Sequence, residues 1–296
     1  MNATARARLN VALSMTIFGT LPLFVRQVHA SSAMIALLRA AIALIALAAV
    51  YFLRGGRGLR VESKKEMLLL LASGAAMGVN WILLFEAYNY VSVQIATLLY
   101  YFAPVIVAVA GALLFHERMG VKRGLCFFGA AIGLLLTIGP DIFSGSIRPA
   151  GVACGLGAAI LYATVILLNT QIRSVGGVER TILQFAAATA VLIVYVALSE
   201  GVHLERISGC EWIFFSMLGL IHTALAFSMY FSGLTRLSGQ EAAFLGYIDP
   251  MVAILVGCLI LREPTTAIQL LGGAMILAFT LIAQLPGKKI HSRAKQ

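Results

Sequence analysis

The chain has 296 residues, of which 60% are hydrophobic and only 11% are charged, and its mean hydropathy is +0.95. Because soluble domains carry roughly 25% charged residues, this composition excludes a soluble globular protein. The net charge of +10 does not indicate nucleic-acid binding, because the basic residues form short clusters between apolar runs without interleaved aromatic residues. Membrane proteins whose positive loops stay in the cytoplasm have this pattern.

Apolar runs fill almost the whole chain, and each is about the 20 residues that a bilayer-spanning helix needs. In chain order they cover residues 8–27, 32–53, 66–88, 91–115, 120–139, 149–170, 178–199, 211–234, 239–261 and 266–285. Glycine, proline and charged residues mark the breaks between them. The predicted fold is an all-α membrane protein with ten transmembrane helices and no separate soluble domain.

The fourth and ninth runs are related to each other in sequence. Residues 92–117 and 238–263 align without gaps, and 9 of the 26 positions are identical. The matches include a proline pair, Pro104 and Pro250, which the apolar bias of the chain does not supply. The alignment therefore predicts that the chain consists of two related halves.

The two predicted halves are residues 1–140 and 141–296, with five helices each. Since five is an odd number, the second half must cross the membrane in the opposite direction. Two inverted repeats around a shared midplane are typical of secondary transporters.

The distribution of basic residues predicts the orientation. With the N-terminus in the cytoplasm, 17 Lys and Arg residues fall in cytoplasmic segments and 4 fall outside, namely Arg26, Arg148, Arg206 and Arg262. The positive-inside rule then places both termini in the cytoplasm. We expect a multi-pass protein of the bacterial inner (plasma) membrane.

Several segments resemble a known family. They are Thr97-Leu-Leu-Tyr-Tyr-Phe-Ala-Pro104, Leu259-Ile-Leu-Arg-Glu263 and an arginine in the second helix, Arg39. With the repeated proline and glutamate, they resemble the EamA type of the drug/metabolite transporter superfamily over essentially the whole chain. Similar proteins export amino acids, purines, drugs and other small metabolites, and some import. These motifs indicate the family but do not name a substrate.

Arg39 lies inside the second predicted helix. Because ionisable groups within the membrane are costly, they are functional hypotheses by default. Arg39 is predicted either to anchor a substrate carboxylate, which a guanidinium can bind through two hydrogen bonds, or to play a structural part by bonding to helix ends or to an acid. Its counterpart in the second half is Gln184.

Asp249 precedes Pro250 in the ninth helix, and its counterpart is Ala103. Two interpretations remain open: a carboxylate for proton coupling or amine binding, or a buried acid paired with Arg39 or with backbone groups freed by the proline. Since proline removes a backbone donor, Pro104 and Pro250 are predicted to open both helices near the midplane for coupling or gating. The alternative for the prolines is a kink that serves packing alone.

The remaining candidate substrate-binding residues combine aromatic rings with polar tips, which suit an organic metabolite. They are Asn80, Trp81, Tyr100, Tyr101, Tyr162, Gln184 and Tyr247. The alternative for each is core packing. His222 is either a coupling residue, since histidine titrates near neutral pH, or a satisfied core residue. Glu117 and Glu263 are predicted to be helix caps or gate elements.

The expected function is a secondary transporter that exports amino acids or similar small organic metabolites by alternating access. No GxxxxGK[ST] motif occurs, so the energy must come from a gradient or from exchange. The alternatives are a proton-coupled drug exporter and a passive channel. An enzyme is not expected, because neither HExxH nor GxSxG occurs. We expect no catalytic residues, cofactor, metal or nucleic acid, and a monomer or homodimer in the lipid bilayer.

Overall fold

The computed structural model describes residues 3–56, 61, 63–114, 121–143, 148–172, 174–175, 177–234, 236–237, 245–246 and 248–284. These residues form helices joined by short connections, and no strand occurs among them. The predicted all-α class is therefore confirmed. Most predicted helix ends lie within about five residues of the observed ones, but the predicted helix 91–115 is broken, and the predicted start of the helix at 239 lies outside the described residues.

The helices follow one another with few long connections. Up to residue 143 they are α1 (Ala3–Val25), α2 (Ser32–Leu53), α3 (Lys64–Tyr90), α4 (Val93–Tyr100), α5 (Ala103–Leu114) and α6 (Val121–Phe143). From residue 149 they are α7 (Pro149–Thr170), α8 (Gly177–Ser199), the 3-10 turn η1 (Leu204–Arg206), α9 (Gly209–Ser216), the π-helix η2 (Met217–Leu225), α10 (Ala226–Leu234), α12 (Ile248–Leu255), the π-helix η3 (Val256–Ile260) and α13 (Ala267–Gln284).

Among the described residues, six helices are long and apolar enough to cross a membrane. They are Ala3–Val25, Ser32–Leu53, Lys64–Tyr90, Pro149–Thr170, Val178–Ser199 and Gly209–Tyr230. Shorter apolar helices cover Val93–Val107, Gly124–Thr137, Ile248–Ile260 and Ala267–Ile282. Large apolar side chains on the outside, such as Leu198 at 83% and Leu259 at 71% exposure, suit contact with lipid rather than water. The chain is a membrane protein.

Serine side chains set where several helices begin. The Ser31 hydroxyl accepts a hydrogen bond from the Met34 N–H at 3.1 Å, and the Ser92 hydroxyl accepts one from the Ile95 N–H at 3.2 Å. Each bond satisfies an N–H group that has no partner within its own helix. The caps therefore stop α2 and α4 from extending into the connections before them.

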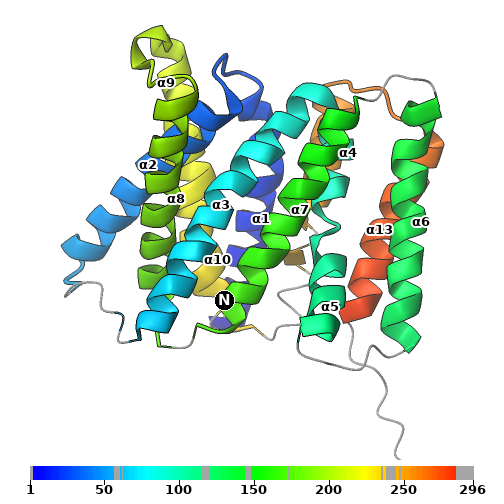
Figure 1. The fold of residues 1–296 in the computed structure, drawn as a ribbon, viewed down its shortest axis with the longest axis horizontal. Helices are drawn as coiled ribbons and strands as arrows, with labels where there is room; N and C mark the ends of the chain where they lie inside the picture. The colour runs from blue at the N-terminus through cyan, green and yellow to red at the C-terminus, as the bar shows by residue number, and fades with distance from the viewer. Residues whose placement is uncertain are drawn as a thin grey trace, which may run out of the picture.

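The bundle has a main body and a separate pair of helices. In Figure 1, α6 and α13 lie side by side at one edge and pack against each other. In the main body, α1 packs against α10 and α12, α7 packs against α3, α4 and α5, and α2 packs against α8 and η2. The hydrophobic core lies in this body, so polar side chains that point inward from its helices meet one another.

Glycines let several helix backbones approach closely. A Cβ atom added to Gly133 of α6 would lie 2.7 Å from the Gly272 carbonyl oxygen of α13, so no larger residue fits there. Gly74 of α3 faces α8 in the same way, because an added Cβ would overlap the Gln184 carbonyl oxygen. Small residues at helix contacts are the usual basis of packing in membranes, where lipid gives no hydrophobic drive between helices.

The fourth predicted helix is broken at the place where proline was expected to open it. α4 ends at Tyr100, α5 begins at Ala103, and Pro104 is the second residue of α5. Pro250 has a similar place, as the third residue of α12. Proline is tolerated in the first turn of a helix, where its missing N–H has no helical partner to lose. The structure thus has a helix break just before Pro104, whereas an opening near the midplane for coupling or gating stays a prediction.

We predict that Gly74→Ala lowers the free energy of unfolding by about 1–3 kcal/mol, because the added methyl group forces α3 and α8 apart. Gly124→Ala in α6 is the matched control, since an added Cβ there meets no atom within 4 Å. Alanine favours helix formation over glycine, so the control should be neutral or stabilising. Thermal unfolding of the two variants in detergent tests this, and equal midpoints would contradict it.

Candidate functional site

Arg39 of α2 lies in the protein interior, with 4% of its surface exposed. Its Nε donates a hydrogen bond to the Thr223 hydroxyl at 2.6 Å. Its guanidinium carbon lies 4.7 Å from the centre of the Trp81 ring and 5.6 Å from that of the Phe85 ring. Both distances allow a cation–π interaction, so aromatic faces take part in stabilising the charge.

The π-helix η2 positions the hydroxyl that Arg39 binds. Thr223 donates its own hydroxyl proton to the Leu218 carbonyl five residues earlier, at 2.7 Å, and its oxygen is then an acceptor for Arg39. Gly219 lets η2 approach α2 closely, because a Cβ atom added to this glycine would lie 2.5 Å from the Ile42 side chain. η2 is nine residues long, and π segments within helices occur frequently at functional sites.

The described contacts of Arg39 include no acid. Within the described ranges no carboxylate oxygen lies within 4.0 Å of its guanidinium, and Thr223 is its hydrogen-bond acceptor. The predicted alternative of a structural ion pair between Arg39 and Asp249 is therefore not what the structure has. Among the described residues, no hydrogen-bond acceptor lies on the two terminal nitrogens of the guanidinium.

Asp249 meets a different partner across the bundle. The Tyr101 hydroxyl donates a hydrogen bond to its Oδ2 at 2.5 Å. Tyr101 lies in the break between α4 and α5, and Asp249 lies in the first turn of α12, where a negative charge is favoured by the helix dipole. Gly19 of α1 packs against the Asp249 backbone, because a Cβ there would lie 2.6 Å from its carbonyl oxygen. Both Tyr101 and Asp249 nevertheless remain partly accessible.

Aromatic rings surround these two groups. Tyr100 and Tyr162 stack with ring centres 4.9 Å apart and an angle of 15° between the rings, and Tyr100 also contacts Tyr101 edge-on. Trp81 packs edge-on against Phe185 at 5.6 Å. The structure thus brings together Arg39 with Trp81, and Asp249 with the three tyrosines. Tyr247 lies outside the described residues.

Two predicted substrate residues bind other parts of the protein. Asn80 donates its amide proton to the Ala158 carbonyl of α7 at 2.5 Å. The Gln184 amide donates to the Ser73 hydroxyl at 2.7 Å and to the Asn169 side-chain oxygen at 2.9 Å. These bonds join α3, α7 and α8, so in this structure Asn80 and Gln184 serve as links between helices.

His222 is enclosed in the core, with 2% of its surface exposed. One ring nitrogen lies 3.2 Å from the Thr20 hydroxyl and the other lies 3.2 Å from the Met217 carbonyl. Its ring also packs against Phe24 at 4.5 Å. Both nitrogens therefore have protein partners, as expected of a satisfied core histidine, and its part in coupling stays a prediction.

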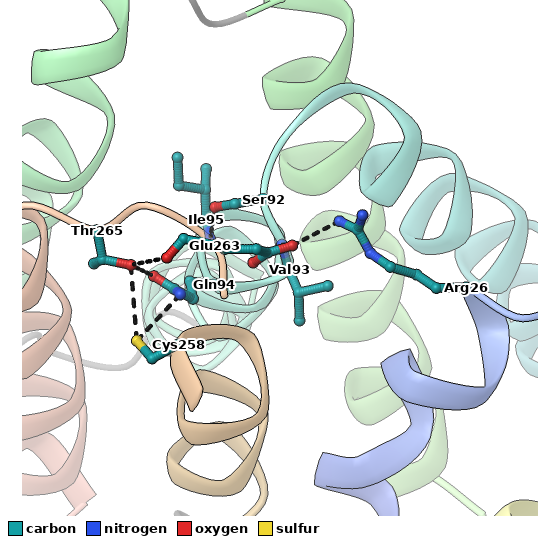
Figure 2. A network of polar contacts seen from close by, with 8 residues as sticks. All are labelled: Arg26, Ser92, Val93, Gln94, Ile95, Cys258, Glu263 and Thr265. Carbon is teal, nitrogen blue, oxygen red and sulfur yellow. Dashed lines mark hydrogen bonds and ion pairs between the residues drawn. The ribbon is translucent and has the colours of Figure 1, made fainter. Parts of the chain in front are cut away.

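A second polar network joins the ends of α1, α4 and η3 (Figure 2). Both Glu263 oxygens accept the Val93 N–H, at 3.1 and 2.9 Å, and one of them accepts Arg26 Nη2 at 2.7 Å. Beside it, Gln94 donates to the Cys258 sulfur at 3.2 Å and accepts the Thr265 hydroxyl.

Glu263 thus caps the N-terminus of α4 from a distant part of the chain. The predicted cap is confirmed, whereas its part in gating stays a prediction. Its counterpart Glu117 lies outside the described residues.

A cavity of about 220 Å³ opens between the ends of α1, α2 and α3. Its lining includes Arg26, Ser32, Phe85, Tyr88 and Asn89. Since one water molecule needs about 10–15 Å³ of such volume, the cavity has room for a small organic molecule. Another cavity, beside Gln94 and Gln269, measures about 20 Å³ and holds little more than one water.

Comparison with known proteins identifies the family. The model of the EamA-like transporter family matches residues 6–139 and again residues 149–284. The chain belongs to the EamA-like transporter family. It is therefore a membrane transporter, and the resemblance seen in the sequence motifs is confirmed.

Individual relatives of this EamA-like protein agree with the family assignment. It is 28% identical to the uncharacterized transporter YxxF of Bacillus subtilis, over 92% of this chain and 87% of that protein. It is 28% identical to the threonine/homoserine exporter RhtA of Escherichia coli, over 79% of this chain and 76% of that protein. A solved crystal structure shares the fold, with a TM-score of 0.66 at 18% identity over 97% of this chain and 100% of its own.

The site of this EamA-like protein contains groups that the sequence did not single out. Thr223 holds Arg39, Phe85 covers it, and Ser73 with Asn169 binds Gln184. Serine, threonine and phenylalanine are common in membrane helices, so their type alone carries no signal. Asn169 could have been predicted to make a polar contact, because an amide near a helix end inside an apolar run needs a partner.

We predict that Gln184→Leu lowers the free energy of unfolding by about 0.6–1.7 kcal/mol, the range for hydrogen bonds between membrane helices. Gln171→Leu at an exposed position is the matched control and should be neutral. Thermal unfolding in detergent measures both. If Gln184→Leu instead kept its stability and changed which compounds are transported, Gln184 would be a substrate contact rather than a link between helices.

Proposed function

We propose that this EamA-like protein exports amino acids or similar small organic metabolites across the plasma membrane by alternating access. The observation that carries the proposal is that Arg39 and Asp249, a basic and an acidic residue inside the membrane protein, form no ion pair with each other. Arg39 binds Thr223 and aromatic rings, whereas Asp249 binds Tyr101. A zwitterionic substrate supplies the missing partner to each.

The chemistry of both groups favours this assignment. A guanidinium matches the two oxygens of a carboxylate, and the carboxylate of Asp249 can accept a hydrogen bond from an amine. The Tyr100 and Tyr162 rings add apolar surface with polar tips. Ionisable groups in the membrane are costly to maintain and mark substrate or ion pathways.

The helix arrangement supports two inverted five-helix repeats. The six longer and four shorter apolar helices amount to ten segments in the expected order. In the proposed repeats, α7 is the counterpart of α1, α3 is that of α10, and α4 with α5 is that of α12. The contacts of α1 with α10 and α12 therefore correspond to the contacts of α7 with α3, α4 and α5. The double family match, to residues 6–139 and 149–284, fits the proposed halves 1–140 and 141–296.

These repeats also supply the transport mechanism that we propose. In such folds the substrate site lies near the midplane, and one set of helices rocks against the other to expose it to each side in turn. The break between α4 and α5, beside Pro104, provides non-helical backbone, which we assign to such a site. In α12, Pro250 stands in the corresponding place, directly after Asp249.

Export and orientation rest on two further observations. The 17 basic residues in segments on one side, against 4 on the other, support a cytoplasmic location of both termini. The name of the relative RhtA, a threonine/homoserine exporter, supports outward transport of amino acids. The relatives in Bacillus subtilis and Escherichia coli favour the bacterial plasma membrane.

A proton-coupled drug exporter is the second candidate, because Asp249 with its tyrosine donor could also carry a proton. In the drug exporter Asp249 is an ion-coupling group, whereas in the amino acid exporter it is a ligand of the substrate amine. A passive channel predicts flux that neither saturates nor shows counterflow.

We predict that proteoliposomes with the wild-type protein show counterflow of a tritiated mixture of the twenty common amino acids, and that Arg39→Gln reduces it about ten- to a hundredfold, as expected for loss of a charged hydrogen bond. Amino acid amides, which lack the carboxylate, should compete poorly with the wild type. In Arg39→Gln the amides and the acids should compete equally. Absence of counterflow in the wild type would overturn the proposed function.

The variant Asp249→Asn separates the two candidates. If Asp249 binds the substrate amine, the variant should lose counterflow at every pH, because counterflow needs no proton gradient. If it carries a proton, counterflow should persist while efflux driven by a pH gradient disappears. Elution of the variant as a single folded species is the control, since a purely structural Asp249 would reduce the folded yield instead.

A further inference from the structure

The cavity of about 220 Å³ lies apart from the central pair of Arg39 and Asp249, between the ends of α1, α2 and α3. Arg26 lines it, and 38% of the Arg26 side chain is exposed. A guanidinium at the edge of a cavity of this size is a binding group for a carboxylate or another planar anion.

We propose that Arg26 forms a second binding site for the substrate carboxylate, on the outer side of Arg39, and that the carboxylate competes there with Glu263. The proposal rests on the function proposed above, because it takes the same substrate and the same orientation. We call this second site the outer site, defined by Arg26, Ser32, Phe85, Tyr88 and Asn89.

A single side chain, that of Phe85, lies between the outer site and the Arg39 guanidinium. Phe85 lines the cavity, and the Arg39 guanidinium lies over the same ring at 5.6 Å. A carboxylate that leaves Arg39 toward this end of the bundle therefore passes Phe85 and next meets Arg26. Two cations in succession give an anionic group a favourable partner at both stages of release.

The surroundings of Glu263 allow its ion pair with Arg26 to break. It is anchored independently, because both of its oxygens accept the Val93 N–H at the start of α4. Only 10% of its side chain is exposed, against 38% for Arg26, so Glu263 is held in place while Arg26 can turn into the cavity. The substrate carboxylate thus replaces Glu263 as the partner of Arg26, whereas Glu263 keeps its hydrogen bond from the Val93 N–H.

An acidic side chain that suits a zwitterion is bound to two residues of the outer site. Glu86 of α3 accepts hydrogen bonds from Ser32 at 2.6 Å and from Asn89 at 3.2 Å, and both of these donors line the cavity. A carboxylate and a guanidinium are thus presented near one small cavity, as Asp249 and Arg39 are at the centre.

Occupation of the outer site has a mechanical consequence. Arg26 directly follows α1, and Glu263 follows η3, so their bond at 2.7 Å ties the end of α1 to the start of α4 and to the connection before α13. When a substrate carboxylate takes Arg26, this tie is released, whereas the cap on α4 stays intact. Substrate release and outward opening are coupled in this way.

The test uses right-side-out and inside-out membrane vesicles from bacteria that produce the full chain, with the tritiated mixture of the twenty amino acids as the probe. Arg26→Gln should raise the KM measured from the outer face about tenfold, the loss of roughly one charged hydrogen bond. The KM from the cytoplasmic face should stay within about twofold of the wild-type value. Arg39→Gln should impair transport from both faces.

The variant Glu263→Gln distinguishes competition from a purely structural ion pair. Because it frees Arg26 and keeps one oxygen for the Val93 N–H, it should lower the outer KM. A structural pair predicts that both variants act in the same direction. Arg262→Gln, which removes an exposed cation one residue away, is the control for charge at this end and should leave the KM unchanged.

Three outcomes would overturn the outer site: an unchanged outer KM in Arg26→Gln, a shift of the same sign in Glu263→Gln, or an equal shift in Arg262→Gln. An effect confined to inside-out vesicles would contradict its placement on the outer side. Absence of amino acid flux in wild-type vesicles would instead overturn the proposed function, and the outer site with it. Thermal unfolding midpoints near that of the wild type confirm that each variant is folded.

Discussion

The arrangement of the interior depends on one constraint, a guanidinium held inside a membrane protein that forms no ion pair with any acid in the described part of the chain. Arg39 keeps its charge because a hydroxyl accepts its Nε proton and two aromatic faces cover its plane. Two features of the helix that carries Thr223 allow this hydrogen bond. Thr223 reaches Arg39 from a π-helix, and Gly219 one turn earlier lets that helix approach α2 closely enough.

Backbone groups at a helix break also need polar partners inside the protein. In lipid, backbone groups that leave a helix must find partners inside the protein. The break between α4 and α5 is placed where Tyr101 can reach Asp249, and the start of α4 is capped by Glu263, which is 170 residues away in the chain from Val93. Polar contacts at the centre and at the end of the bundle therefore stabilise the interrupted helix.

The predicted candidate residues fall into two groups in the structure. Arg39, Trp81, Tyr101 and Asp249 face the interior, where depth and residue type had indicated a site. Asn80 and Gln184 have the same depth and the same polarity, but they link α3 to α7 and α8. Depth along a helix can be counted from the sequence, whereas the direction of a side chain depends on which neighbour packs against that face. For this reason the sequence could not separate the two groups.

The sequence by itself determined the all-α class, the order and approximate ends of the helices, the membrane environment and the family. These follow from local properties: runs of apolar residues, breaks at glycine and proline, and short motifs repeated in both halves. Only the tertiary structure decided that Arg39 binds Thr223, that Asp249 meets Tyr101, and that Arg26 and Glu263 pair across 237 positions of the chain. Such pairings arise from the packing of distant helices, for which a single sequence carries no local signal.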